Sequence, residues 1–265
     1  MILVLGGTTE GRELALELQR NGYPCLLSVA TELGAKMIAD RPLNIRIGEL
    51  NINVLKELLQ RESIKLIIDA THPYAVVIKD IARHAAEAAG IIYCRFERQP
   101  SVLPEDPRLV VAEDYSAVLE ILQQDRSGIL FTIGVKNLYQ FRALWAEQER
   151  PVWVKIYPEL QSLKTCQELG LGPEQIFAFH GAGTREILKD IIGMTGVLWL
   201  VTKESGSAGG FDVKVAAALE TGINIVVVKR PPNNAQTVFY NIKEVLDFME
   251  MNPQICRPMI NLIES

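Results

Sequence analysis

The stretch LVLGGTTEGRELA, residues 3–15, joins a short apolar run to a helical pattern through a glycine-containing turn. The apolar, β-rich residues predict a buried strand, and Leu14 and Leu18 fall on one face of the helix that follows. The turn between them leaves free N–H groups and the positive end of a helix dipole facing outward, which suits a phosphate group. This first strand-turn-helix unit indicates a nucleotide-binding α/β fold.

The turn resembles two phosphate-binding loops without matching either completely. Gly6 and Gly11 have the spacing of a P-loop, but Arg12 and Glu13 stand where that loop needs Lys and Ser or Thr. The same glycines fit the first and third glycines of a dinucleotide loop, G-x-G-x-x-G, whose middle position holds Thr8. A variant dinucleotide loop therefore remains, and a merely tight turn is the alternative.

Apolar runs alternate with helical patterns along the rest of the chain, which predicts parallel sheets covered on both faces. The runs that follow the first are PCLLSVA, LNIRIG, KLIIDA and IIYCRF, and later LVVA, GILFTIG, PVWVKIY, QIFAFHG, VLWLVTK and INIVVVKRP. Helices are expected between them, among others near residues 34–39, over 51–61, and from about Pro73 to Gly90.

The proline-rich segment at residues 97–108, ERQPSVLPEDPR, interrupts this alternation and is interpreted as a linker. We therefore expect an α/β protein of two Rossmann-like, doubly wound parallel-sheet domains. The N-terminal dinucleotide-binding domain would span residues 1–98 and the C-terminal α/β domain residues 99–250. A tail at residues 251–265 has no clear period and no predicted role.

Composition limits the function classes. Of 265 residues, 48% are hydrophobic and 22% are charged, as in ordinary soluble enzymes, and the net charge of -5 disfavours nucleic acid and anionic membranes as partners. The chain starts directly with a strand, without a leader pattern, so a cytoplasmic location is expected. The four cysteines are scattered and are interpreted as small buried apolar residues, and the few histidines do not form a metal-binding pattern.

Loops that follow strands are the expected ligand sites, because ligands of parallel sheets bind at the carboxyl ends of strands. In the first such loop Thr8 or Thr9 can cap the helix, and Arg12 can add a charged donor to a pyrophosphate. The residues of this loop predicted to bind the cofactor are Gly6, Gly7, Thr8, Thr9, Glu10, Gly11 and Arg12.

The end of the second strand bears on cofactor choice. NAD sites usually place Asp or Glu there, whereas this chain has Ser28 and, a little further on, Thr31. Either side chain can contact the ribose or its 2′-phosphate, and Lys36 is a nearby cation. The pattern leaves both NADPH and NADH open.

The segment IIDATHPYA, residues 67–75, places polar side chains after a buried strand. Asp69 ends that strand, Thr71 and His72 follow it, and Pro73 suits the first position of a helix. A well-capped helix start explains this pattern as well as a functional cluster does. Thr71 is predicted to contact the cofactor, and Asp69 and His72 are predicted to be catalytic.

Two loops of the second domain are rich in glycine and lysine, which favours an anion. A flexible surface loop is the alternative. FTIGVKN, residues 131–137, contributes Lys136; VTKESGSAGGFDVK, residues 201–214, contributes Lys203, Ser205, Gly206 and Lys214; and Arg230 ends the last predicted strand.

Taken together, these stretches resemble the precorrin-6A reductase family, which includes the cobalt-precorrin-6A reductases. The segments that carry the resemblance occur in family order and are LGGTTEGR, SVATELG, IIDATHPYA, FTIGVKNL, VTKESGSAGGFDVKVAAA and VVVKRP. The first, third and fifth are distinctive as a set.

The resemblance implies a two-domain Rossmann-like enzyme that uses NADPH or NADH, and we expect it to be a monomer or a weak homodimer. Its substrate would be a corrin precursor, a tetrapyrrole, bound in the cleft between the domains and reduced at one double bond. For such a substrate, the candidates for binding the carboxylates are Lys136, Lys203, Lys214 and Arg230, with Ser205 and Gly206. His72 is the candidate proton donor on the protein, and water or a ring nitrogen are the alternatives. The alternatives are another NAD(P)-dependent reductase or a non-catalytic dinucleotide sensor; the Tyr-x-x-x-Lys pattern of short-chain reductases is absent.

Overall fold

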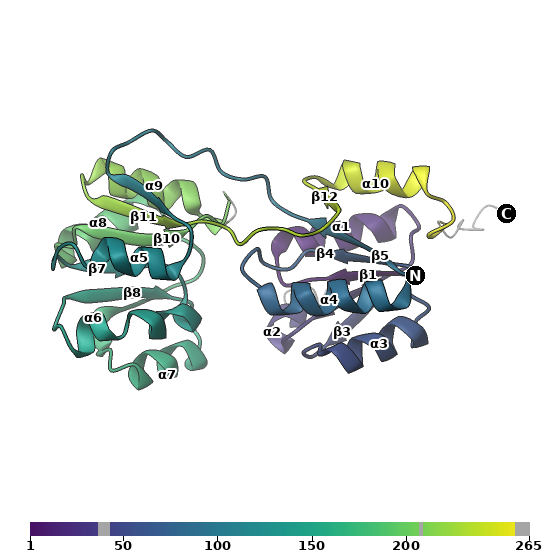
Figure 1. Ribbon diagram of the computed structural model, residues 1–265, viewed down its shortest axis with the longest axis horizontal. Coiled ribbons are helices and arrows are strands. Elements are labelled where there is room, and N and C mark those ends of the chain that lie inside the picture. Colours follow the sequence, from purple (N-terminus) through teal and green to yellow (C-terminus); the bar gives the residue numbers. More distant parts are fainter. Residues whose placement is uncertain (37–42, 207–208, 258–265) are drawn as a thin grey trace. The chain divides into compact units, whose positions relative to one another are not determined.

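The computed structural model describes residues 1–36, 43–206 and 209–257, which form two compact units. Unit 1 comprises Met1–Gln99 together with Pro231–Ser265, and unit 2 comprises Pro100–Arg230 (Figure 1). The sequence-based division assigned residues 231–250 to the second domain and differs here from the structure. This segment belongs to unit 1 because Val245 and Met249 are buried in the core of that unit.

Unit 1 is built on a parallel sheet of six strands in the order β12-β5-β4-β1-β2-β3. Its strands are β1 (Ile2–Leu5), β2 (Cys25–Val29), β3 (Ile45–Ile47), β4 (Leu66–Asp69), β5 (Ile92–Phe96) and β12 (Thr237–Phe239). The strands are all parallel, but the order in which they are added reverses between β1 and β4, and in sheets of this kind a crevice lies at the carboxyl ends of that central pair. Strand β12 was not predicted from the sequence.

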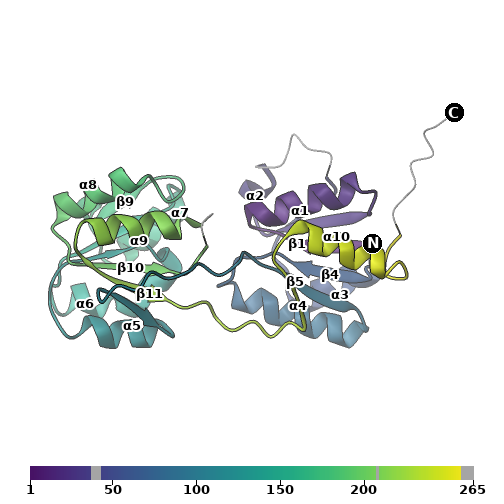
Figure 2. The same ribbon diagram turned by 90° about the horizontal axis from the view of Figure 1, so that it is seen from above.

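The alternating directions of strand side chains explain the two cores of this sheet. Ile2 and Val4 pack toward helices α1 and α10, whereas Leu3 and Leu5 pack toward α3 and α4 on the opposite face (Figure 2). The helices of unit 1 are α1 (Thr9–Arg20), α2 (Glu32–Lys36), α3 (Ile52–Arg61), α4 (Val76–Ala89) and α10 (Ile242–Met251).

Unit 2 contains a second parallel sheet of six strands, in the order β6-β11-β10-β7-β8-β9. Its strands are β6 (Leu109–Ala112), β7 (Ile129–Phe131), β8 (Val152–Ile156), β9 (Ile176–Ala178), β10 (Trp199–Lys203) and β11 (Asn224–Val228). Its helices are α5 (Tyr115–Leu122), η1 (Val135–Phe141), α6 (Ala143–Ala146), α7 (Leu160–Glu168), η2 (Pro173–Gln175), α8 (Arg185–Thr195) and α9 (Phe211–Glu220). Helices α8 and α9 share one core with the central strands, and α5 packs on β6 and β11.

The two sheets have the same connectivity, including an unusual feature at one edge. In each, five consecutive strands are wound outward from a central pair, and the sixth place is taken by a strand from elsewhere in the sequence. In unit 1 this strand is β12, which follows the whole of unit 2; in unit 2 it is β6, which precedes the other five. The prediction of two Rossmann-like parallel-sheet domains is confirmed.

Several local predictions were tested by the structure. Helix α4 begins at Val76, not near Pro73, and the helix expected near residues 34–39 is described as Glu32–Lys36, with residues 37–39 outside the described part. The four cysteines are buried and free, as predicted. Within the described ranges, no helix is both long and apolar enough to cross a membrane.

Candidate functional site

The turn between β1 and α1 has the geometry of a phosphate-binding turn. Thr8 caps α1 by accepting a hydrogen bond from the N–H of Gly11 at 3.0 Å, which confirms the predicted cap. Gly7 has φ of +127°, and outside its chain neighbours no described atom lies within 4 Å of the position that a Cβ would take. The backbone is therefore open to a ligand at the point where the helix dipole is directed outward.

The same turn packs closely on the end of β4. The Thr8 hydroxyl donates to the Ala70 carbonyl at 2.9 Å, and a Cβ added to Gly11 would lie 3.0 Å from the Cβ of Ala70. Gly11 thus has the role of the third glycine of a dinucleotide loop, which allows close packing of the helix. Because of these contacts, a displacement of the β4–α4 turn would also displace the β1–α1 turn.

An arginine that the sequence analysis missed lies at the ends of β2 and β3. Arg46 is the register partner of the buried Ser28 across these strands, and its Nη1 lies 3.4 Å from the Ser28 hydroxyl. Its guanidinium also donates to the carbonyls of Gly48 and Glu49. Thr31 is exposed and caps α2 by accepting from the N–H of Gly34 at 3.2 Å. Of the two predicted residues, Ser28 therefore lies beside a fixed cation.

A hydrogen-bonded network with a buried ion pair at its centre connects the carboxyl ends of β4 and β5. The Asp69 carboxylate accepts from the backbone N–H of Thr71 at 2.9 Å, from its hydroxyl at 2.7 Å and from the Tyr93 hydroxyl at 2.7 Å. Arg95 lies 2.7 Å from Asp69 and donates to the Thr71 carbonyl at 3.1 Å. The side chains of Asp69 and Arg95 are 0% exposed. Their buried hydrogen bonds to Thr71 therefore fix the conformation of the β4–α4 turn.

Arg95 remains charged in this position. Burial alone would lower its pKa, but Asp69, Glu97 and Tyr93 raise the pKa above its ordinary value. Burial raises the pKa of Tyr93 strongly, and the negative charge of Asp69 adds to this, so the phenol stays protonated. Removing either member of the Arg95 and Asp69 pair would leave a buried charge without its partner.

A second arginine from the same region contacts the first turn of α1. Arg98 donates to the Glu10 carboxylate at 2.8 Å, and Glu10 lies in the first turn of α1. Burial would raise the pKa of Glu10, but the hydrogen bond and charge of Arg98 lower it overall. The pair is neutral as a whole, so the carboxylate of Glu10 does not repel a phosphate at this helix end.

A small hollow lies between these groups, with room for about one water molecule (≈ 10 Å³). It is bounded by the β1–α1 turn, by the β4–α4 turn and by the end of β5. Its lining residues are Thr8, Glu10, Ala70, Thr71, Pro73, Arg95, Phe96, Glu97 and Arg98.

The residues after Thr71 form a turn, not the start of a helix. His72 Nδ1 accepts from the N–H of Tyr74 at 3.3 Å, and α4 has Ala75 as its N-cap, without a side-chain cap. The expectation that Thr71 or His72 caps a helix beginning at Pro73 was therefore wrong. Thr71 is engaged by Asp69 and Arg95 instead, because these buried groups need its hydroxyl and carbonyl.

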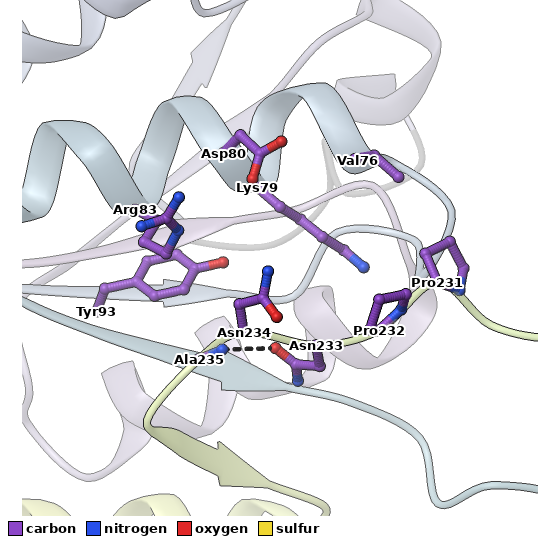
Figure 3. A pocket seen from close by; sticks show the side chains of 10 residues that line it. All are labelled: Val76, Lys79, Asp80, Arg83, Tyr93, Pro231, Pro232, Asn233, Asn234 and Ala235. Atoms are coloured by element: carbon purple, nitrogen blue, oxygen red, sulfur yellow. Dashed lines mark hydrogen bonds between the residues drawn. The ribbon is translucent and has the colours of Figure 1, made fainter.

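A larger pocket of ≈ 140 Å³ lies on the α4 side of the sheet. Figure 3 shows Lys79 extending from α4 toward the segment that leads into β12, with Tyr93 on the neighbouring strand. Asn233 in this segment accepts from the N–H of Ala235 at 3.0 Å. None of the predicted site residues lines this pocket, although Tyr93 connects its wall to Asp69.

Unit 2 gathers lysines at the carboxyl end of its sheet. Lys203 ends β10 and Lys214 lies in the first turn of α9, and burial lowers the pKa of each to about 8. The positive charges of Lys155 and Lys203 lower the pKa of Lys214 further. Lys155 was missed from the sequence. We call Lys155, Lys203 and Lys214 the lysine cluster.

The other predicted residues of unit 2 have different surroundings. Arg230 pairs with Glu204, which also accepts from the N–H groups of Ser101 and Gly206. Ser205 is buried, and Lys136 is exposed at the start of η1. Residues 207–208 of the glycine-rich loop lie outside the described part of the chain.

Sequence signals existed for the missed residues. Arg46 and Lys155 each interrupt an apolar strand pattern, LNIRIG and PVWVKIY, close to its carboxyl end. Arg95 and Glu97 do the same in IIYCRFER. Ligands of parallel sheets bind at the carboxyl ends of strands, so a charged residue near such an end is a candidate binding residue, as the glycine-rich loops are.

The two parallel six-stranded sheets define a two-domain α/β protein of the Rossmann-like type. Residues 1–250 match the family described as "Precorrin-6x reductase CbiJ/CobK". The chain therefore belongs to this family.

Individual relatives agree with this assignment. The cobalt-precorrin-6A reductase of Priestia megaterium is 31% identical over 93% of this chain and 96% of its own. That of Methanothermobacter thermautotrophicus is 33% identical over 93% of this chain and 82% of its own. A solved structure titled "CobK precorrin-6A reductase" matches with a TM-score of 0.74 and 26% identity, covering 94% of this chain and 96% of the other.

Proposed function

We propose that this protein reduces one double bond of precorrin-6A, in its cobalt-containing form, with NADPH as the hydride source, as a step of cobalamin synthesis. The observation that carries the proposal is the family match over residues 1–250 together with the open β1–α1 turn. The nicotinamide supplies the hydride, and the residues of the chain supply position and electrostatics.

The cofactor would lie across the crevice at the carboxyl ends of β1 and β4. Its pyrophosphate would accept from the N–H groups of the β1–α1 turn, where Gly7 leaves the backbone open and Arg12 adds a charged donor. Arg12 is already oriented along this helix end, because its Nη2 donates to the Thr9 hydroxyl at 2.9 Å.

Arg46 supports NADPH over NADH. An acidic residue at the end of β2 would bind a ribose diol, whereas the position is held by Ser28 with Arg46 beside it. A guanidinium here can pair with a 2′-phosphate in two parallel hydrogen bonds.

Replacing Arg46 tests this choice. We expect Arg46→Met to weaken NADPH binding by about 10- to 100-fold, because a charge-assisted contact is lost, and to change NADH binding by less than about threefold. Isothermal titration of both cofactors measures the two affinities. Exposed Arg20, which pairs with Glu17 in the last turn of α1, provides Arg20→Met as the control. An equal loss for both cofactors would contradict the proposal and make Arg46 a structural residue.

The lysine cluster would bind carboxylates of the corrin precursor. An anion would stabilise the ammonium group of Lys214, which is buried and repelled by the charges of Lys155 and Lys203. Lys155 also lies over the Phe179 ring, 4.7 Å from its centroid. Arg230 is held by Glu204, so we assign its contribution to shaping the glycine-rich loop.

Asp69 and His72 were predicted to be catalytic, and their surroundings favour supporting roles. Asp69 is 0% exposed and is occupied by Thr71, Tyr93 and Arg95. His72 Nδ1 accepts a backbone N–H, and an imidazolium would lose that hydrogen bond. We therefore propose that His72 shapes the turn and that water delivers the proton.

A substitution at His72 distinguishes these roles. We expect His72→Gln to keep the rate of single-turnover hydride transfer within about threefold of wild type between pH 6 and 8. A fall of about 10²- to 10⁴-fold would instead identify His72 as the proton donor. His84→Gln, at an exposed position of α4, is the matched control.

The activity itself is tested by anaerobic incubation with cobalt-precorrin-6A and either NADPH or NADH. The expected product is heavier by two hydrogens, measured by mass spectrometry, and forms faster with NADPH. Metal-free precorrin-6A is the comparison substrate. A protein that binds NADPH tightly yet reduces neither tetrapyrrole would contradict the proposal.

A further inference from the structure

The direction of the bound cofactor follows from the order of strands around the crevice. If the adenosine ribose lies at the end of β2, beside Ser28 and Arg46, the other half of the dinucleotide extends over the ends of β4 and β5. The small hollow bounded by Thr8, Thr71 and Glu97 lies there. It has space for about one water molecule, so it fits a single polar group at the edge of a nicotinamide ring and not the ring itself.

Glu97 is held in this hollow from two sides. Its backbone N–H donates to the carbonyl of Phe239 in β12 at 2.9 Å. Arg95 approaches its carboxylate with Nε and Nη2, each 2.9 Å from the same oxygen, Oε1. The side chain is 10% exposed, so it has little freedom to move, and the contacts found in the described chain leave Oε2 available to a ligand.

We propose that Glu97 is a specificity residue for the cofactor: its Oε2 accepts a hydrogen bond from the carboxamide NH2 of the nicotinamide, and Arg95 is the positioning residue that fixes it. This inference rests on the cofactor site proposed above. A carboxylate has acceptors and no donor when ionised, so it distinguishes the NH2 end of the carboxamide from the oxygen end. The contact would fix the rotation of the ring and hence the face that presents the hydride.

The test uses a cofactor analogue that lacks this donor. In reduced 3-acetylpyridine adenine dinucleotide phosphate a methyl ketone replaces the carboxamide, so no N–H faces Glu97. We expect wild-type protein to bind NADPH more tightly than this analogue by about 10- to 100-fold, because a charge-assisted hydrogen bond is lost. Calorimetric dissociation constants give the ratio without any turnover.

Glu97→Gln should remove this discrimination. Its amide oxygen can keep the contact with Arg95, which leaves an N–H group to face the cofactor. The carbonyl of the analogue accepts from that group as well as a carboxamide does, so the ratio should fall to within about threefold of unity. Glu97→Asp, which keeps the charge but withdraws the carboxylate by one methylene group, serves if the glutamine variant does not fold and should also reduce the ratio.

Arg95→Lys tests the positioning role. Lysine lacks the planar group that makes two contacts with one carboxylate, so we expect a partial loss of discrimination together with a lower melting temperature. The matched control is Arg150→Lys in unit 2, another buried arginine (1% exposed) that donates to the carbonyls of Leu122 and Ser127. It should lose stability and keep the wild-type ratio.

The outcomes separate this inference from the proposed function. An unchanged ratio in folded Glu97→Gln overturns the role of Glu97, and equal ratios in Arg95→Lys and Arg150→Lys overturn that of Arg95. If Gly7→Asp, at the phosphate-binding turn, leaves NADPH affinity intact, the cofactor site itself is misplaced. If Gly7→Asp abolishes binding while the Glu97 ratio is unchanged, the proposed function stands and this inference fails.

Discussion

Gly7→Asp is expected to lose NADPH binding almost completely while the protein remains folded. In the free protein a Cβ at Gly7 meets no described atom within 4 Å, so the side chain itself has space. That space is where the pyrophosphate is proposed to lie, and a like charge about 4 Å away costs roughly 4 kcal/mol near a protein surface, or several hundred-fold in affinity. Isothermal titration with NADPH measures the loss.

Backbone strain must be separated from this effect. Gly7 has φ of +127°, a conformation that L-residues rarely adopt, so some destabilisation is expected from any side chain. Gly90→Asp is the control, because Gly90 also has positive φ, +63°, with no described atom near its Cβ position, and it ends α4 at the opposite edge of the sheet. A Gly7→Asp protein that melts cooperatively and binds NADPH as Gly90→Asp does would refute the site.

The second large effect is expected in the lysine cluster. Lys203→Met and Lys214→Met should each weaken binding of cobalt-precorrin-6A by about 10- to 100-fold, because each removes a charge-assisted contact from a partly dry site. NADPH affinity should change by less than about threefold, since the cluster belongs to unit 2. Lys164→Met, at an exposed position of α7, is the control. Equal losses for both ligands would place the cluster at the cofactor.

Because the pKa values of Lys203 and Lys214 are lowered, both the stability of the protein and its affinity for the tetrapyrrole should depend on pH. Both lysines titrate near pH 8 in the folded protein, against 10.5 for an ordinary lysine, so between these values the unfolded chain binds more protons. The free energy of unfolding of the ligand-free protein should therefore rise with pH across this window, and tetrapyrrole affinity should fall as the ammonium groups are lost. Urea unfolding and titration calorimetry from pH 7 to 10 measure both trends. Lys214→Met should flatten each curve; parallel curves for wild type and Lys214→Met would contradict the assignment.

Features determined by residues close together in the sequence were predicted well, and features determined by residues far apart in the sequence were not. The β1–α1 turn was predicted well because Thr8, its cap and its glycines act within a few residues. Strand β12 was not, because three residues carry too little pattern and its partner β5 lies far away in the sequence. The pairing of Ser28 with Arg46 needs the strand register, which no local pattern contains.

Buried charges were the other source of error. Arg95 occurs in a strand where a charged residue usually faces solvent, yet its side chain is 0% exposed because Asp69 and Glu97 are buried with it. Such a network can be recognised when strands β4 and β5 are known to be neighbours. The same network explains why α4 begins at Val76 and not near Pro73. Thr71 forms hydrogen bonds with Asp69 and Arg95 and does not cap the helix.

The late position of β12 in the chain has a consequence for how the protein is made. As the chain leaves the ribosome, Met1–Gln99 appears before unit 2, with one edge of its sheet and part of its apolar core uncovered. Unit 2 is continuous in sequence and can fold as soon as it has emerged, whereas unit 1 must wait for its last strand and helix. During that interval the unpaired edge of β5 is the site at which nascent chains would aggregate through strand pairing. A stop codon before Thr237 would therefore damage the nucleotide-binding half of the protein, although every residue proposed to touch the nucleotide would already have been translated.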